Sequence, residues 1–404
     1  MYNTKTDFFP KTCANELCYS ACQEINLLRL TSKLSYREAE EELNAQRWQD
    51  DDQQIKFRTL ADIVERDGRE ISNYIDDKTN EILTQHGFDP KTGRPTEIDI
   101  VEKNVLDPQT QRVSEDKVKQ VLEEYNADKD KEYQIDEAKI HEVYEIAEQT
   151  VDISADDVLV TEQKESGRTP NSEPKDKKHF VKNTVIHIQQ GGQKYVLTGL
   201  GIVKQLIVLA AFLLHNNLFA NKDLIFFTDG ADDIKNAIRA IFGWRPFRII
   251  LDWFHLRKKS AERLSMAMKG KELRNQTLKK ILLFLWRGDV DGAVEYLRNL
   301  DPSTVKDTAQ IKKLIEYLLK NKEFIPCYIL RKKLGLRNSS NRVEKANDLV
   351  VAKRQKNNGT SWSKDGSSGL AKVTALFLNN EAKNWTRRKQ LEFKLPSTTA
   401  EKCA

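Results

Sequence analysis

The sequence predicts a mixed α/β protein, in which one sheet is interrupted by an all-helical insertion and preceded by a helical N-terminal region. Three observations lead to this fold class. Residues 1–150 are dominated by helix-forming side chains in amphipathic spacing. From Asp152 the pattern changes to short apolar runs separated by turn signals. After Asp252 helical patterns return for about 90 residues before a final polar segment.

The N-terminal region divides at the Gly- and Pro-containing stretch His86–Glu97. The strings LSYREAEEELNAQRW, before it, and EDKVKQVLEEYNADKDKEYQIDEAKIHEVYEIAEQT, after it, are expected to be helical. The stretch Arg58–Leu83 is read as two helices joined by a turn at Asp67 and Gly68. That layout is compatible with a helix-turn-helix that enters a DNA major groove, or with an ordinary helical hairpin.

The central segment predicts the sheet. The expected elements are a strand in DISADDVLV, a loop or hairpin insert at Glu162–His179, a hairpin of NTVIHIQQ and KYVLTGLG around Gly191-Gly192, a helix at about Ile202–His215, a strand at Leu224–Gly230, a helix in ADDIKNAIRAIFG and a strand at Phe247–Asp252. Three strands in a meander, followed by helix, strand, helix and strand, is the order expected of a ribonuclease-H-like mixed sheet.

These patterns predict three units. The first is a helical N-terminal region, residues 1–150, with a possible role in DNA binding or dimerisation. The second is a ribonuclease-H-like core formed by residues 151–258 and 338–390. The third is a helical insertion, residues 259–337, that separates the two parts of the core.

Composition excludes several classes of protein. The longest apolar run, Ile207–Leu214, is too short to span a membrane, and the N-terminus lacks the layout of a signal peptide. Five cysteines, an odd number, argue for a reducing compartment, so we expect a cytoplasmic protein. Cys13, Cys18 and Cys22 lack a matching second pair of ligands and are expected to pack in the fold rather than to bind zinc.

Charge is distributed unevenly along the chain. Residues 1–150 hold 34 acidic and 20 basic side chains, whereas the remainder holds 27 acidic and 46 basic ones. A basic unit of this kind favours a polyanionic partner such as nucleic acid, because binding releases counterions from the phosphate backbone. A lysine-rich solubilising surface explains the same charge equally well.

Four aspartates stand in or directly after predicted strands, where ligand sites of α/β proteins are found. Asp229 directly follows an apolar strand and precedes a glycine and a helix, although capping of that helix is an alternative role. Asp156 and Asp157 lie within the first predicted strand, where an acid is costly to bury unless it is paired or binds metal. Because side chains alternate across a strand, only one of the two can face the site. Asp252, after FRIIL, is a further candidate with the same alternative.

Glu344 is the candidate from the last segment. Ser339, Ser340 or Asn341 is expected to cap a helix that runs to about Asn357, with Asn347 and Asp348 on the same face as Glu344. The alternative role of this glutamate is to complement the helix dipole. Two strand carboxylates and one helix carboxylate can together hold two divalent cations for attack on a phosphodiester, and oxygen ligands favour Mg²⁺ or Mn²⁺.

The chain resembles a known family over more than half of its length. The matching strings are ISADDVLVTEQKES, FFTDGADDIKNAI, IILDWFHLRKK, IPCYILRKKLGLRNSSNRVEKANDLVVAKRQKNNGTSWS and GSSGLAKVTAL. From Asp152 to about Trp385 they resemble, in order, the DDE-type transposases of bacterial insertion sequences, in particular the Kra-type group allied to Mutator-like transposases. The helical insertion lies where that family places it.

This resemblance implies that Asp156, Asp229 and Glu344 are the catalytic and metal-binding acids. Related sequences usually carry glycine after the first acid, so Asp157 is an alternative for that position. Asp252 and His255 match the D-x-x-H signature of Mutator-like transposases, in which they support the active site or the insertion. For His255 an ordinary structural role at the start of a helix is an equal alternative.

The implied activity is metal-dependent hydrolysis at transposon ends, followed by strand transfer into target DNA. The implied partners are double-stranded DNA, both terminal repeats and target, and further copies of the chain in a homodimer or higher oligomer, bound to the nucleoid when on DNA. The run Lys353-Arg354-Gln355-Lys356 is expected to contact phosphates, and Trp362 either to stack on a base or, the preferred interpretation, to pack under the final helix. A non-catalytic DNA-binding protein derived from a transposase, and a nuclease without strand joining, are the alternatives.

Overall fold

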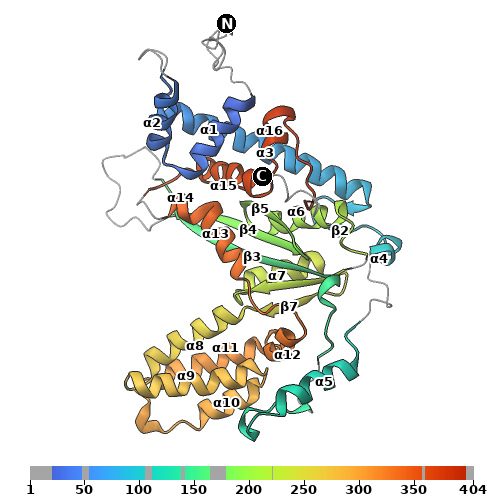
Figure 1. Cartoon of the computed structure of the whole chain (residues 1–404), viewed down its shortest axis with the longest axis vertical. Coiled ribbons are helices and arrows are strands. Elements are labelled where there is room, and N and C mark those ends of the chain that lie inside the picture. Colours follow the sequence, from blue (N-terminus) through green and yellow to red (C-terminus); the bar gives the residue numbers. More distant parts are fainter. Residues whose placement is uncertain are drawn as a thin grey trace.

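The computed structural model describes residues 21–47, 54–104, 112–137, 142–163, 179–220, 222–356 and 360–396. Over these residues the protein is mixed α/β, with a five-stranded sheet at its centre (Figure 1). The N-terminal helices lie together with the last C-terminal ones near the β5 (Gln193–Leu200) end of the sheet. A bundle of helices, α8 to α11 (residues 253–320), lies beyond the edge formed by β7 (Arg248–Leu251). The predicted class, a mixed sheet combined with many helices, is confirmed.

The sheet contains two antiparallel pairs and two parallel pairs. Its strands are β3 (Thr150–Thr161), β4 (Phe180–Gln190), β5 (Gln193–Leu200), β6 (Asp223–Thr228) and β7 (Arg248–Leu251). Their order is β5-β4-β3-β6-β7, with β3–β4 and β4–β5 antiparallel and β3–β6 and β6–β7 parallel. The tight turn predicted at Gly191-Gly192 joins β4 to β5. Most of the predicted insert Glu162–His179, residues 164–178, lies outside the described residues.

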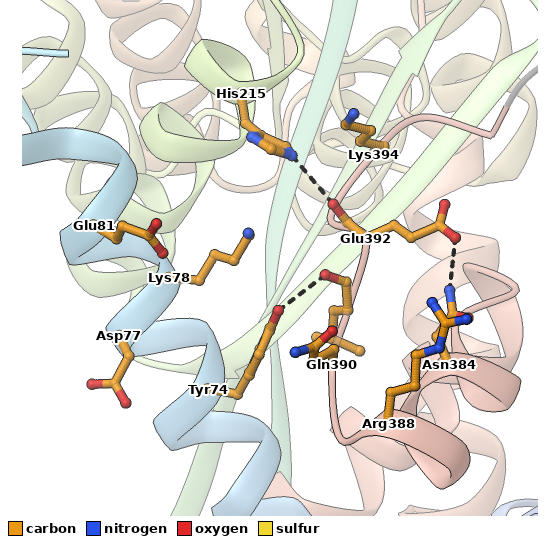
Figure 2. A pocket seen from close by; sticks show the side chains of 11 residues that line it. Tyr74, Asp77, Lys78, Glu81, His215, Asn384, Arg388, Gln390, Glu392 and Lys394 are labelled. Atoms are coloured by element: carbon orange, nitrogen blue, oxygen red, sulfur yellow. Dashed lines mark hydrogen bonds between the residues drawn. The ribbon is translucent and has the colours of Figure 1, made fainter. Parts of the chain in front are cut away.

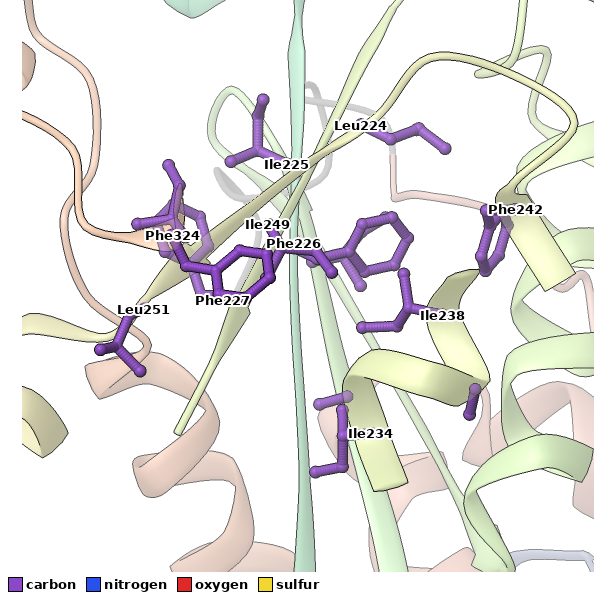
Figure 3. Packing of buried hydrophobic residues seen from close by; sticks show 14 of the residues in the cluster. Leu224, Ile225, Phe226, Phe227, Ile234, Ile238, Phe242, Ile249, Leu251 and Phe324 are labelled. Atoms are coloured by element: carbon purple, nitrogen blue, oxygen red, sulfur yellow. The ribbon is translucent and has the colours of Figure 1, made fainter. Parts of the chain in front are cut away.

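The two parallel strands are apolar because both of their faces are covered. Every residue of β6 is buried, and Phe226 packs on Phe242 of the helix α7 (Asp232–Phe242) with 5.2 Å between ring centroids. Figure 3 shows these side chains between the strands and α7, with Phe324 reaching the same cluster from the helical insertion. The helix α6 (Ile202–His215), whose bounds are those predicted, contributes to this core.

A second core covers the other face of the sheet. It joins the N-terminal helices α1 (Ala21–Lys33), α2 (Tyr36–Arg47) and α3 (Phe57–Gln85) to the C-terminal helices α15 (Lys364–Leu378) and α16 (Ala382–Arg388). The two ends of the described chain therefore fold together, as Figure 1 shows in blue and red.

The predicted turn at Asp67 and Gly68 is wrong. Both residues lie inside the single 29-residue helix α3, so this segment is no helix-turn-helix. Gly68 packs against Gly369 of α15, where a Cβ on Gly68 would come within 2.2 Å of the Gly369 Cα. The glycine therefore permits a close helix crossing instead of ending a helix.

The segment after α3 is less helical than expected. Residues Phe88–Asp89 (β1) and Arg94–Pro95 (β2) form a short antiparallel pair, followed by α4 (Ile98–Asn104) and α5 (Glu115–Asn126). Between Asn126 and Thr150 the described residues form only short 3₁₀ turns and a bridge from Glu145 to Arg112, so the helical prediction for Glu115–Thr150 is wrong after Asn126. Buried ion pairs hold this stretch in place instead, since Glu145 contacts both Arg331 and Arg248.

Helices follow β7, as the pattern after Asp252 predicts, and the predicted start of the insertion, residue 259, lies inside the first of them. These helices are α8 (Trp253–Ala267), α9 (Lys271–Trp286), α10 (Val290–Arg298), α11 (Thr308–Lys320) and α12 (Tyr328–Lys333). The short 3₁₀ turns of the described chain are Lys131–Tyr133, Ala147–Gln149, Pro302–Thr304 and Lys322–Phe324. In the part of the chain that the structure describes, no helix has the length and apolar character needed to cross a membrane.

The helix predicted after Ser340 is present but irregular. It consists of α13 (Asn341–Asn347), a π-helical stretch (Asp348–Ala352) and α14 (Lys353–Gln355). π-Helical turns inside α-helices occur frequently at functional sites. This one directly follows the turn that carries Glu344.

Candidate active site

The structure places Asp156 and Asp229 side by side on neighbouring strands. The last parallel pair between β3 and β6 is Ser154 with Phe227. Two residues further along each chain stand Asp156, still on β3, and Asp229, directly after the end of β6. Residues in register on parallel strands project from the same face of a sheet, so these carboxylates are neighbours at its carboxyl edge.

Asp156 faces the helix that carries Glu344. The Asn347 Nδ2 donates a hydrogen bond of 2.6 Å to the Asp156 Oδ2, and the Asp157 backbone N–H donates one of 2.8 Å to the Oδ1. Asn347 lies one turn after Glu344 on the same helix. The helical spacing predicts that Asn347 and Glu344 share one face of their helix. The structure shows that Asn347 uses this face to bond Asp156 of β3.

Asp157 points to the other face of the sheet. Its Oδ1 accepts a hydrogen bond of 2.6 Å from the Thr184 hydroxyl, and its Oδ2 lies 2.7 Å from the Lys182 Nζ. Lys182 also pairs with Asp233 at the start of α7. Asp157 is thus neutralised on the α7 side, whereas Asp156 lies beside Asp229.

Asp229 is held in place by the turn that leads into α7. Its Oδ1 accepts a hydrogen bond of 2.8 Å from the Ala231 backbone N–H, so part of its role is to shape the start of this helix. Gly230, between them, has φ of +90°, and a Cβ there would lie 2.9 Å from the Leu251 side chain. Glycine is required at this position by both conformation and space.

Asp252 ties the insertion to the helix of Glu344. It is fully buried, caps α8 by accepting from the His255 N–H at 2.9 Å, and lies 3.2 Å from the His255 Nδ1. Its Oδ2 accepts hydrogen bonds from the backbone N–H and, at 2.9 Å, the hydroxyl of Ser340, which precedes α13. Sequence reasoning missed the role of Ser340 as a partner, because the two residues are 88 positions apart and no local pattern links them.

His255 connects this junction to Glu344. Its Nε2 lies 3.7 Å from the Glu344 Oε1, and the Glu344 side chain is 37% exposed. Because Asp252 holds the Nδ1 side of the ring, the Nε2 side is directed at Glu344. His255 therefore stands at the start of α8, as expected, with its ring between a buried aspartate and the third candidate acid.

The charges of the site act on one another. Burial raises the pKa of Asp156, the hydrogen bond from Asp157 lowers it, and the negative charge of Asp229 raises it further. The hydrogen bond to Asp252 raises the pKa of His255 despite partial burial, and the charges of Asp252, Asp229 and Glu344 add to that increase. The site therefore carries an excess of negative charge that one histidine offsets only in part.

The chemistry of this donor set fits a hard divalent cation in part. Oxygen ligands of the kind that Asp156, Asp229 and Glu344 offer suit Mg²⁺ or Mn²⁺, and a cation would relieve the repulsion that raises the pKa of Asp156. Among the described residues, however, no three or more His, Cys, Asp or Glu side chains are arranged so that they could hold a metal ion. The two strand carboxylates are adjacent, while Glu344 is turned toward His255.

Of two further predicted features, the basic run at Lys353–Lys356 differs in part from expectation and Trp362 agrees with it. Arg354 is buried, with its guanidinium 5.1 Å from the ring centroid of Tyr36 and 5.3 Å from that of Trp362, and Gln355 is buried against Ser367. The expected phosphate contacts of this run are therefore wrong for these two side chains, although Lys353 and Lys356 are exposed. Trp362 is buried, in agreement with the packing interpretation.

Of the three N-terminal cysteines predicted to pack in the fold, only Cys22 lies among the described residues. Cys22 is exposed, so the expectation that it packs in the fold is wrong. Cys13 and Cys18 lie outside the described residues.

A polar groove lies away from this site. It is formed between α3, the end of α6, α16 and the segment that follows α16, and Figure 2 shows its side chains. The Tyr74 hydroxyl donates to the Leu391 carbonyl at 3.2 Å, and Asn384 donates to Glu392 at 2.8 Å. None of the predicted site residues lines this groove.

No family model matches the chain, and no curated protein matches it at a significant level. The resemblance to DDE-type transposases therefore rests on the motifs in the sequence.

Proposed function

We propose that this protein is a DNA transposase of the DDE type, built on a ribonuclease-H-like core. The observation that carries the proposal is the juxtaposition of Asp156, in the middle of β3, and Asp229, directly after the parallel strand β6, with Asn347 of the Glu344 helix bonded to Asp156. Carboxylates gathered from two strands and a later helix are suited to phosphoryl transfer, which depends on positioning and charge neutralisation.

The topology supports this proposal. Three antiparallel strands followed by two parallel strands, in the order β5-β4-β3-β6-β7, correspond to the strand order expected of a ribonuclease-H-like core. The helical insertion stands between β7 and α13, where the family resemblance places it.

In this proposal Asp156, Asp229 and Glu344 would hold two Mg²⁺ or Mn²⁺ ions, with Glu344 turned from His255 toward the two aspartates. Ions held there would supply Lewis-acid activation of a water or 3′-hydroxyl and neutralisation of the charge on a leaving oxygen. Asn347 fixes the Oδ2 side of Asp156, and Asp252 fixes both the His255 ring and the beginning of α13. His255 lies close enough to Glu344 to bind this acid when no cation does.

The partners in this proposal are the DNA ends of the mobile element and the target DNA. Support comes from the excess of basic residues after residue 150. Cutting of two ends in concert favours a homodimer or higher oligomer on DNA, in the cytoplasm and at the nucleoid.

The test uses purified protein and linear DNA that carries the sequences flanking its gene, with Mg²⁺, with Mn²⁺ and with chelator. The proposal expects metal-dependent nicks at two defined positions and joined products with added target DNA. Glu344→Gln should abolish both products, while Asp348→Asn, an exposed acid on the next turn, should retain them.

Each other result has a defined meaning. Binding without metal-dependent nicks contradicts the enzymatic proposal and favours a DNA-binding protein. Nicks without joined product contradict the transposase proposal and favour a nuclease.

A further inference from the structure

Phe254 is an exposed aromatic side chain beside the candidate active site. It stands between Trp253 and His255 in the first turn of α8 and is 44% exposed. Its ring meets the His255 ring edge-on, with centroids 5.8 Å apart and an interplanar angle of 83°. His255 contacts Glu344, and Phe254 directly precedes His255 in the chain. Phe254 therefore lies beside the candidate carboxylate site.

The exposed face of α8 continues from Phe254 into basic residues. Arg257 and Lys258, three and four positions later, share its side of the helix and are both exposed. Neither forms an ion pair with another described residue, although the exposed Glu262 stands one turn after Lys258 on the same helix. An aromatic ring and two cations without an ion pair among the described residues are thus presented together next to the site.

Single exposed apolar residues are common on protein surfaces, so exposure alone indicates nothing. The position distinguishes Phe254 from the other exposed aromatic residues of the described chain, Tyr133 and Phe180. Tyr133 belongs to a 3₁₀ turn far along the chain from any candidate acid, and Phe180 begins β4 opposite Thr161. Phe254 alone of these three adjoins a residue of the site.

We propose that Phe254 stacks on an unpaired base of the DNA strand that is cut, while Arg257 and Lys258 bind the phosphates of that strand. An aromatic ring needs an open base face, and the bases of a duplex cover one another's faces. A single strand or a locally opened duplex is therefore the ligand that this surface fits. The proposal rests on the function proposed above, and it adds the path of the strand and the need for local unpairing.

The test measures binding of a 20-nucleotide single-stranded oligonucleotide that contains one 2-aminopurine, and of its duplex, without divalent metal. Stacking on Phe254 predicts that the wild type quenches 2-aminopurine fluorescence. Phe254→Ala should lose the quenching and bind the single strand about tenfold more weakly, with an unchanged salt dependence, and Phe254→Trp should restore both. Tyr133→Ala is the matched control and should behave as wild type.

A double substitution, Arg257→Gln with Lys258→Gln, tests the phosphate contacts. The slope of log affinity against log salt for single-stranded DNA should decrease by about 1.4, since each phosphate contact contributes about 0.7. The proposal is overturned if the Phe254→Ala variant binds single-stranded DNA and quenches 2-aminopurine fluorescence as the wild type does. It is also overturned if this variant loses as much affinity for the duplex as for the single strand. Because these measurements need no cleavage, a protein that stacks DNA but never nicks it refutes the enzymatic function and leaves the binding surface intact.

Discussion

At the scale of single residues, Asp252 is the side chain that joins the start of α8 to the start of the Glu344 helix. Its two carboxylate oxygens accept from the backbone and side chain of His255 and from the backbone and hydroxyl of Ser340. Burial alone would raise the pKa of Asp252, but the hydrogen bonds from His255 and Ser340 outweigh it and keep the pKa below its usual value. The carboxylate therefore stays charged at neutral pH, and donors of His255 and Ser340 occupy both of its oxygens.

Asp252→Asn should lower the free energy of unfolding by about 2–4 kcal/mol, because an amide offers one accepting oxygen and turns an N–H toward existing donors. Urea denaturation measures this loss. Asp348→Asn, an exposed change on the next helix, should leave stability close to that of wild type. Equal stabilities of the two variants would contradict the role assigned to Asp252.

Asn347 acts on the reaction through Asp156. Asn347→Ala removes the donor that holds the Asp156 Oδ2, and we expect nicking to slow by about 10- to 100-fold, as for other residues that orient metal ligands. The apparent affinity for Mn²⁺ should weaken along with the rate. A slower rate at unchanged Mn²⁺ affinity and reduced thermal stability would mean that Asn347 has only a structural role.

Glu145 predicts a pH dependence of stability. Burial raises the pKa of Glu145, but the Arg331 and Arg248 guanidinium groups outweigh burial, so the pKa is lower in the folded protein than in the unfolded chain. The contribution of Glu145 to the free energy of unfolding is therefore fully present at pH values above its pKa in the unfolded chain, about 4.3. This contribution is lost as the pH decreases through the lower pKa of the folded protein. The gap in unfolding free energy between wild type and Glu145→Gln should be widest at neutral pH and narrow below about pH 4.

Urea denaturation of both proteins from pH 3 to pH 7 checks this expectation. A gap that stays constant across the range would show that Glu145 keeps its proton state and that its ion pairs carry no pH dependence.

Sequence reasoning named Asp156, Asp229 and Glu344, but it could not choose between Asp156 and Asp157. Alternation along a strand assigns the two acids to opposite faces without telling which face is the site. The choice depends on Asn347 on one side and Lys182 on the other, contacts made by residues distant in the sequence.

At the scale of helices and strands, the crossing of α3 and α15 shows how a contact between residues distant in the sequence decides the effect of a substitution. Helix propensity alone predicts that Gly68→Ala stabilises α3 by up to about 1 kcal/mol. The contact with Gly369 predicts the opposite sign, a loss of about 1–3 kcal/mol, because the methyl group would force the helices apart.

Chemical denaturation of Gly68→Ala measures the sign. Gly192→Ala is the control, since a Cβ there meets nothing within 4 Å. A stabilised Gly68→Ala protein would mean that the two helices do not cross closely in solution.

Elements with strong local patterns were predictable, and elements held by distant contacts were not. The continuous apolar run of α6 and the buried strand β6 were found because hydrophobic pattern alone specifies them. The turn expected at Gly68 and the long helix expected after Asn126 were wrong, because the crossing with α15 and the ion pairs of Glu145 decide those conformations.

At the scale of the whole molecule, the sheet separates two helical bodies that are linked at the site. The insertion begins with α8, whose cap residue Asp252 also binds the start of α13, so a movement of the insertion would reach Glu344. The chain ends fold together on the far side, where α3 meets α15 and α16. The succession of strands and helices from Thr150 to Leu251 was predicted from the sequence, whereas this junction was not.

The most direct test of the account compares metal-dependent nicking by Asp156→Asn, Asp229→Asn and Asp157→Asn under single-turnover conditions, each with its thermal stability measured. The account predicts a loss of about a thousandfold or more for Asp156→Asn and Asp229→Asn, and a rate close to wild type for folded Asp157→Asn. Loss of nicking in Asp157→Asn with activity retained in Asp156→Asn, or full activity in Asp229→Asn, would contradict the site described here.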